Sequence, residues 1–145
     1  MNFHVTTSWK HIGRFELAGT GYQLKVPSEI PSLPGVYKII AMDAPDWFNQ
    51  IYVGEGRNLL RRLNNYRNAG YEPSRPAATN RRVQGWIYEG LSNHFCSFEI
   101  HICTEGIATD STGPKMDLDF SHKHSRLLVE NLVRTTESDL RFENV

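Results

Sequence analysis

The pattern of apolar and polar positions predicts three strands in the body of the chain. Residues 35–42 are rich in β-branched and aromatic side chains, and residues 50–54 repeat that character after a short loop. The two segments are expected to pair as an antiparallel hairpin. Residues 95–103 alternate apolar and polar side chains, which is typical of a half-buried strand. Residues 104–118 carry Gly, Thr, Ser, Pro and Asp without a period and are expected to form a loop.

Apolar residues at helical spacing predict three helices. Asn58 is expected to cap the first helix. The second follows a Pro-rich loop over 70–78, and Thr79 or Asn80 is expected to cap it. The third is expected from about residue 120 to residue 136. The expected apolar positions are Leu59, Leu60 and Leu63 in the first helix, Val83, Trp86, Ile87 and Leu91 in the second, and Leu127, Leu128, Leu132 and Val133 in the third.

An extension precedes these elements. Apolar residues alternate on both sides of Gly19-Thr20-Gly21, which predicts a β-hairpin. Three prolines before residue 35 exclude a helix there. We therefore expect an N-terminal extension over 1–32 and a single domain over 33–145. The expected fold is an α/β (α+β) sandwich in which a small three-stranded antiparallel sheet is flanked by helices. The extension has three interpretations: added strands at the sheet edge, a DNA clamp, or a dimer surface.

Composition describes an ordinary globular protein and narrows its partners. The chain has 145 residues, of which 39% are hydrophobic and 22% charged, which argues against a disordered chain. Lys plus Arg and Asp plus Glu both number 16, so bulk charge does not attract nucleic acid. No apolar run approaches the roughly 20 residues of a membrane span, and the first residues do not resemble a signal peptide. We expect a cytoplasmic protein with no membrane partner, in which Cys96 and Cys103 are ordinary thiols.

The neutral total conceals a cluster of positive charge around the first two expected helices. Seven arginines lie between residues 57 and 82, against one acidic residue, Glu72. We call them the arginine belt: Arg57, Arg61, Arg62, Arg67, Arg75, Arg81 and Arg82. Arginine forms forked hydrogen bonds with phosphate, and the interleaved Tyr66, Tyr71 and Trp86 can stack on bases. A nucleic-acid surface and a solvated helix face both remain open interpretations.

Four segments resemble the motifs of one nuclease family. They are GVY at 35–37, YVG at 52–54, NLLRRL at 58–63 and LLVENLV at 127–133. Their order and spacing resemble the GIY-YIG nuclease family over residues 33–144. This family includes the N-terminal domain of the bacterial excision-repair nuclease, phage homing endonucleases and some restriction enzymes.

The resemblance implies a divalent-metal-dependent endonuclease that hydrolyses DNA phosphodiester bonds with Mg²⁺ (or Mn²⁺). The residues that it implies as catalytic are Tyr37, Tyr52, Arg62, Tyr66 and Glu130, with Glu130 as the metal ligand and Gly35 and Gly54 as structural residues. Arg62 is suited to bind phosphate, and Tyr37 or Tyr52 is expected to act as general base if its pKa is lowered by Arg62 and a metal-bound water. The residues expected to contact DNA are Arg57, Asn58, Arg61, Arg67, Arg81, Arg82 and Asn144.

Two other functions remain open beside the enzyme. One is a catalytically silent GIY-YIG-fold module that binds nucleic acid, and the other is a protein-interaction domain that uses the arginine belt. Intact Tyr37, Tyr52, Arg62 and Glu130 favour the enzyme, because a binding module does not need all four. The sequence contains no recognisable DNA-recognition domain, so specificity is expected from loops, from a homodimer or from a partner chain.

Overall fold

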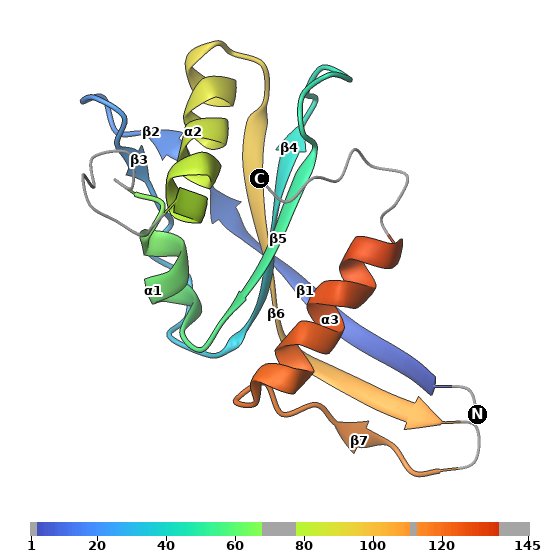
Figure 1. Ribbon diagram of the computed structural model, residues 1–145. Coiled ribbons are helices and arrows are strands. Elements are labelled where there is room, and N and C mark those ends of the chain that lie inside the picture. The colour runs from blue at the N-terminus through green and yellow to red at the C-terminus, as the bar shows by residue number, and fades with distance from the viewer. Residues whose placement is uncertain (1–2, 68–77, 111–112, 137–145) are drawn as a thin grey trace.

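The structure, a computed structural model, describes residues 3–67, 78–110 and 113–136 (Figure 1). Its elements are β1 (Phe3–Arg14), β2 (Glu16–Leu17), β3 (Leu24–Lys25), β4 (Gly35–Met42), β5 (Ile51–Gly56), α1 (Leu59–Asn64), α2 (Ala78–Ser92), β6 (Ser97–Asp110), β7 (Met116–Asp117) and α3 (Lys123–Thr136). The strand pairs are antiparallel. The expected α/β class with an antiparallel sheet is therefore confirmed at this level.

The main sheet is larger than the three strands expected from the sequence. Its order is β1-β6-β4-β5, and β7 also pairs with β6. The three predicted strands are β6, β4 and β5. On the other edge of β6, β1 pairs from Phe3 opposite Asp110 to Arg14 opposite Glu99. The N-terminal extension thus adds a strand to the sheet.

The expected loop over 104–118 is wrong for most of its described residues. Strand β6 continues to Asp110, and Met116–Asp117 forms β7 opposite Ile107 and Ala108. Backbone hydrogen bonding to β1 on one side and to β7 on the other keeps this polar, Gly-containing segment extended. A segment that is hydrogen-bonded to a strand on each side can form a strand without alternating apolar and polar side chains. The sequence pattern therefore did not predict this half of β6.

The hairpin predicted in the extension is present as β2 and β3, with Glu16 opposite Lys25 and Leu17 opposite Leu24. Gly19 and Gly21 adopt positive φ angles of 90° and 52° in the turn, a conformation that glycine adopts without strain. Phe15 and Leu24 are buried in the main core, which attaches this small sheet to the domain.

The strands of the main sheet separate two cores. Along β4 and β5 successive side chains point to opposite faces. Tyr37, Ile39 and Tyr52 pack on one face with α1 and α2, whereas Val36 and Val53 pack on the other face with α3. Figure 1 shows α1 and α2 grouped apart from α3. A functional site that uses both helix layers must therefore form where the two faces meet, at an edge of the sheet.

The helices differ from expectation at their ends. α1 ends at Asn64, so Tyr66 lies in the turn that follows it. α2 begins at Ala78, which places Thr79 and Asn80 inside the helix and not at its cap. The predicted cap at Asn58 is present, since its side chain accepts a hydrogen bond from the Arg61 backbone N–H at 3.0 Å. The Pro-rich loop falls mostly outside the described residues.

The buried face of α3 is not the apolar face expected from the sequence. Leu127 and Leu128 are exposed, and the buried residues are Arg126, Val129, Glu130 and Val133. These four positions have i, i+3, i+4 and i+7 spacing and share one helix face. The two charged residues are tolerated because each has an ion-pair partner: Glu55 for Arg126 and Arg134 for Glu130.

Candidate active site

The site begins where β4 pairs with β5. Tyr37 lies directly opposite Gly54. A Cβ atom at Gly54 would lie 2.5 Å from Cζ of Tyr37, so the tyrosine ring occupies the space above the glycine backbone. A Cβ at Gly35 would lie 2.5 Å from the carbonyl oxygen of Cys103. Both glycines thus have a steric reason to lack a side chain, and Gly54 fixes the place of Tyr37.

Three tyrosines meet on the α1 and α2 face of the sheet. Tyr37, Tyr52 and Tyr66 are buried, with ring centroids 6.2 to 6.4 Å apart. We call them the tyrosine cluster. The hydroxyl groups of Tyr37 and Tyr66 lie 2.5 Å apart and form a hydrogen bond. The Tyr66 backbone N–H donates to the carbonyl of Leu63, so a turn, not the expected helix, brings Tyr66 to its partners.

Arg62 lies beside this cluster on α1. Its Cζ atom is 5.2 Å from the centroid of the Tyr66 ring, within the range of a cation–π contact. Its Nη1 donates to Oδ1 of Asn80 on α2 at 2.8 Å. Asn80 was one of two residues expected to cap α2, but in the structure its side chain holds the guanidinium group of Arg62. Because arginine has five N–H donors, this bond leaves capacity for an anionic substrate.

Glu130 comes to the site from α3. Its side chain is mostly buried, and Oε1 accepts a hydrogen bond from Nη2 of Arg134 at 2.8 Å. Burial raises the pKa of Glu130, the nearby Arg134 lowers it, and the negative charge of Glu55 raises it again. The net result is a raised pKa. The influence of Glu55 shows that the two carboxyl groups lie within electrostatic range of each other.

Glu130 and the tyrosine cluster belong to opposite faces of the sheet yet share one electrostatic environment. The charge of Arg62 affects the pKa of Glu130, and both Arg62 and Glu130 affect that of Tyr37. β5 is the last strand in the sheet order. Side chains from the two faces can therefore approach each other around its edge. The structure thus brings together the five residues that the resemblance implies as catalytic.

Glu55 and Arg126 are site residues that sequence reasoning misjudged or missed. Glu55 follows the predicted strand over 50–54, and in the structure it lies in β5 opposite Val36. Its Oε2 is 3.4 Å from Nε of the buried Arg126. Arg126 also donates from Nη1 to the carbonyl oxygen of Phe120 at 2.8 Å. Residues 51, 53 and 55 alternate with their neighbours along the strand, so their side chains point to the same face, which α3 covers. This alternation is a signal in the sequence that places the side chain of Glu55 on that face. A lone helix arginine gives no such signal.

The electrostatics of the tyrosines correct one expectation. Burial raises the pKa of Tyr37, and Arg62 offsets only part of that rise. The pKa of Tyr66 is also raised, first by burial and then by the neighbouring Tyr37. The expectation that the pKa of Tyr37 is lowered toward neutrality is therefore wrong for the protein by itself. At neutral pH both residues are uncharged phenols, one of which donates to the other. Tyr52 remains the other expected base.

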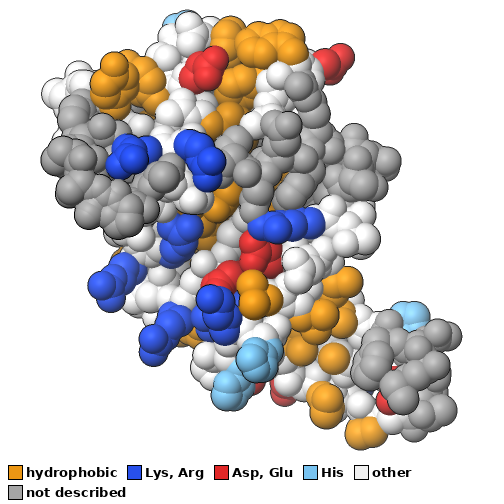
Figure 2. Space-filling model, in the orientation of Figure 1, with side chains coloured by type: hydrophobic (Ala, Val, Ile, Leu, Met, Phe, Trp, Pro, Cys, Tyr) orange, Lys and Arg blue, Asp and Glu red, His pale blue; other side chains and the backbone are white. Residues whose placement is uncertain are grey.

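The arginine belt lies around this site. Arg57, Arg61, Arg67 and Arg82 are exposed, Arg81 is half-buried, and Arg75 lies outside the described residues, as does Asn144. Figure 2 shows Lys and Arg side chains gathered around a small group of acidic side chains on this face. A positive surface around buried carboxylates fits a polyanion that approaches a cation-binding centre.

The donor set fits magnesium better than zinc. Among residues 3–67, 78–110 and 113–136, no group of three or more His, Cys, Asp or Glu is arranged to hold a metal ion. Glu130 with Glu55 offers one or two carboxylates. Mg²⁺ is commonly held in this way, because it keeps several water ligands. Zinc prefers a set of His and Cys ligands that this site lacks.

No protein-family model, curated protein or solved structure matches this chain. None of the helices in the described part of the chain has the length and apolar character needed to cross a membrane.

Proposed function

We propose that this protein is a GIY-YIG-type, divalent-metal-dependent endonuclease that hydrolyses DNA phosphodiester bonds. One observation carries the proposal. Tyr37 of β4, Arg62 of α1 and Glu130 of α3 are distant in the sequence, but the fold brings them near enough for Arg62 and Glu130 to affect the pKa of Tyr37. A tyrosine, an arginine and a carboxylate at one sheet edge can supply a hydrogen-bond donor, a phosphate ligand and a metal ligand for phosphodiester hydrolysis.

Arg62 is the residue that binds the phosphate. Asn80 and the ring of Tyr66 hold its guanidinium group in place before substrate arrives. A positioned, permanently charged fork stabilises the charge that develops on the phosphoryl oxygens. Tyr37 is uncharged and linked to Tyr66. Tyr52, in its deprotonated phenolate form, is the residue that we assign to accept a proton from the attacking water, which returns it to the neutral phenol.

Glu130, assisted by Glu55, is the group that would hold Mg²⁺ or Mn²⁺. The ion, when bound, stabilises the charge on the phosphoryl and leaving oxygens. The exposed members of the arginine belt, together with the half-buried Arg81, contact the DNA backbone on either side of the cleaved bond. The residues with this role are Arg57, Arg61, Arg67, Arg81 and Arg82, with Asn58 at the start of α1.

Plasmid cleavage tests the proposal. Supercoiled plasmid is incubated with protein and Mg²⁺, Mn²⁺ or chelator, and nicked and linear products are measured. Arg62→Ala and Glu130→Ala should lower the rate at least about 100-fold. Asn64→Ala is the matched control, because Asn64 is exposed on the same helix and has no assigned role, and it should keep most activity. Cleavage that survives in chelator or in both variants would contradict the proposal.

A binding module is the second candidate, and one observation favours it. Both carboxylates of the site already have arginine partners, Arg134 for Glu130 and Arg126 for Glu55. Such pairs also occur where carboxylates are purely structural. DNA binding without cleavage in the presence of metal would select this function. Binding should then weaken steeply with salt, with a slope of about 0.9 per phosphate contact on duplex DNA.

A further inference from the structure

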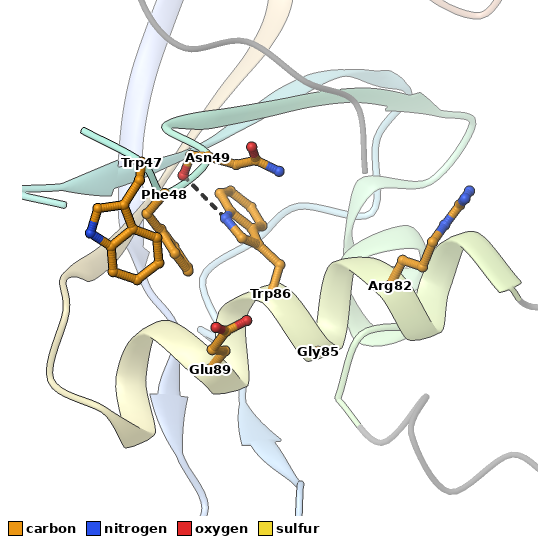
Figure 3. Close-up of a pocket in the computed structure, with 7 residues that line it drawn as sticks. All are labelled: Trp47, Phe48, Asn49, Arg82, Gly85, Trp86 and Glu89. Carbon is orange, nitrogen blue, oxygen red and sulfur yellow. Dashed lines mark hydrogen bonds between the residues drawn. The ribbon is translucent and has the colours of Figure 1, made fainter. Parts of the chain in front are cut away.

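A second open pocket lies between the β4–β5 loop and the exposed face of α2 (Figure 3). Its volume is about 620 Å³, within the range of sites for small molecules. Trp47, Phe48 and Asn49 line it from the loop, and Trp86 lines it from the helix. None of these residues has a role in the proposed cleavage.

The pocket has one fixed and one exposed indole. The Trp86 N–H donates to the carbonyl oxygen of Asn49 at 3.1 Å, and its ring stacks on Phe48 with an interplanar angle of 20°. Trp47 remains 59% exposed, although its ring also contacts that of Phe48. Exposed aromatic rings of this kind are the surfaces on which unpaired bases stack.

Gly85 keeps the pocket open. It lies in the middle of α2, where glycine is less favourable than alanine. A Cβ atom at Gly85 would meet nothing within 4 Å, so packing against the described residues does not require glycine there. Arg82, Gly85, Trp86 and Glu89 have i, i+3, i+4 and i+7 spacing and share one helix face. A ligand that lies on this face gives a reason for the missing side chain.

The charges on this face suit a nucleotide. Arg82 and Glu89 are seven residues apart, about 10 Å along the helix axis. Arg82 belongs to the arginine belt and can bind a phosphate. Glu89 repels a second phosphate, but its carboxylate can accept a hydrogen bond from the amino group of a base. The aromatic surface lies between the two charges.

We propose that this pocket receives an unpaired nucleobase of the strand that the site cleaves, an inference that rests on the proposed function. Helix α2 links the two places. Asn80, which holds Arg62, precedes Trp86 by six residues, about 9 Å along the axis. That length corresponds to roughly three nucleotides at the 3.4 Å rise of stacked DNA, and to fewer in an extended single strand. A base inside a duplex must be flipped out before it can enter such a pocket, and this costs the least for a base that is already unpaired. The substrate is therefore DNA with an unpaired nucleotide near the cleaved bond, as in single-stranded or branched DNA.

The test compares labelled oligonucleotides of equal length in chelator, where cleavage is blocked. One is a deoxycytidine strand, whose bases carry an amino group, and the other is an abasic strand with the same number of phosphates. Fluorescence anisotropy should show that wild-type protein binds the deoxycytidine strand about tenfold more tightly. Trp47→Ala and Gly85→Leu should abolish this preference. Met116→Ala, a change at an exposed residue of β7, should keep it. Melting curves show whether each variant is folded.

Equal binding of the two strands by wild-type protein would overturn the pocket, as would a preference that survives in folded Gly85→Leu protein. Neither result would contradict the proposed nuclease, which plasmid cleavage tests separately. The reverse result, a base preference without cleavage of any DNA, would support the pocket and contradict the nuclease. Failure to bind either strand would overturn the pocket and favour a protein partner for this face.

Discussion

The hydroxyl groups of Tyr37 and Tyr66 lie 2.5 Å apart, and both side chains are fully buried. Burial raises the pKa of each, so at neutral pH the pair consists of two phenols, one of which donates to the other. β4 supplies one partner and the turn after α1 supplies the other. This bond therefore ties the sheet to the segment that carries Arg62.

Removing either hydroxyl should destabilise the protein. Tyr37→Phe or Tyr66→Phe leaves the other hydroxyl buried without this partner, which should lower the free energy of unfolding by about 1–3 kcal/mol. The double variant should lose clearly less than the sum of the two single changes, because both remove the same bond. Urea unfolding measures all four proteins. Additive losses would show that the two hydroxyls do not depend on each other.

Gly54→Ala should displace the side chain of Tyr37 in the candidate site. The new methyl group would lie 2.5 Å from Cζ of Tyr37 and must displace the ring. We expect a loss of about 1–3 kcal/mol in unfolding free energy, together with reduced cleavage. Gly85→Ala is the matched control, since its methyl group meets open space. It should stabilise the protein by about 0.5–1 kcal/mol. Equal thermal stability of the two variants would contradict the packing described for Tyr37.

Asn80 should matter through Arg62. Asn80→Ala removes the acceptor that holds the guanidinium group, and we expect cleavage to slow about tenfold to 100-fold, as for other groups that orient a functional residue. Asn80→Asp keeps an acceptor oxygen and should recover much of the rate. In protein that already carries Arg62→Ala, the further change Asn80→Ala should not alter the cleavage rate. A rate that depends on Asn80 even without Arg62 would indicate a separate role for the amide.

Glu130 should make stability depend on pH. Burial raises its pKa above the ordinary value of 4.5. The folded protein then binds more protons than the unfolded chain, so this contribution to stability is present below pH 4.5 and is lost as the pH rises through the raised value. Because glutamine does not titrate, the free energy of unfolding of Glu130→Gln, relative to that of wild type, should increase as the pH rises from about 4 to about 8. Urea midpoints at both pH values measure the gain. Arg134→Met removes a positive charge that lowers the pKa of Glu130. This variant should therefore lose more stability than wild type as the pH rises from about 4 to about 8.

Metal binding should appear as thermal stabilisation. Mg²⁺ at about 100 times its dissociation constant should stabilise the wild-type protein by about 2.7 kcal/mol. Glu130→Gln should lose most of this effect, and Glu55→Gln part of it. Melting curves with Mg²⁺ and with chelator measure the difference without reference to cleavage. Equal stabilisation of wild type and Glu130→Gln would place the ion elsewhere.

The parts of the fold that depend on side-chain pattern were predictable. The strand over 35–42 and the cap at Asn58 follow from local residues and are present as expected. The second half of β6 was not predictable, because backbone bonds to β1 and β7 determine it. The buried face of α3 was missed for a related reason. Arg126 is buried only because Glu55 of β5 lies beside it, and a partner distant in the sequence leaves no local pattern.

The candidate site shows the same division. Motif spacing selected Tyr37, Arg62 and Glu130, and the fold brings them into electrostatic range. Spacing did not reveal that Asn80 holds Arg62. It also missed the sign of the Tyr37 pKa shift, because a nearby arginine is visible in the sequence whereas complete burial is not.

The pairing of β1 with β6 sets an order for folding. Phe3 pairs with Asp110, so β1 leaves the ribosome before its partner strand and has no pairing surface until residues about a hundred positions later have been made. Contacts between such distant residues form slowly, because a long loop must close first. The β4–β5 hairpin and α1 are adjacent in the chain and can form before that. Strand β1 is therefore made before the other strands of the main sheet but is among the last to pair, and the edge of β6 stays open until it does.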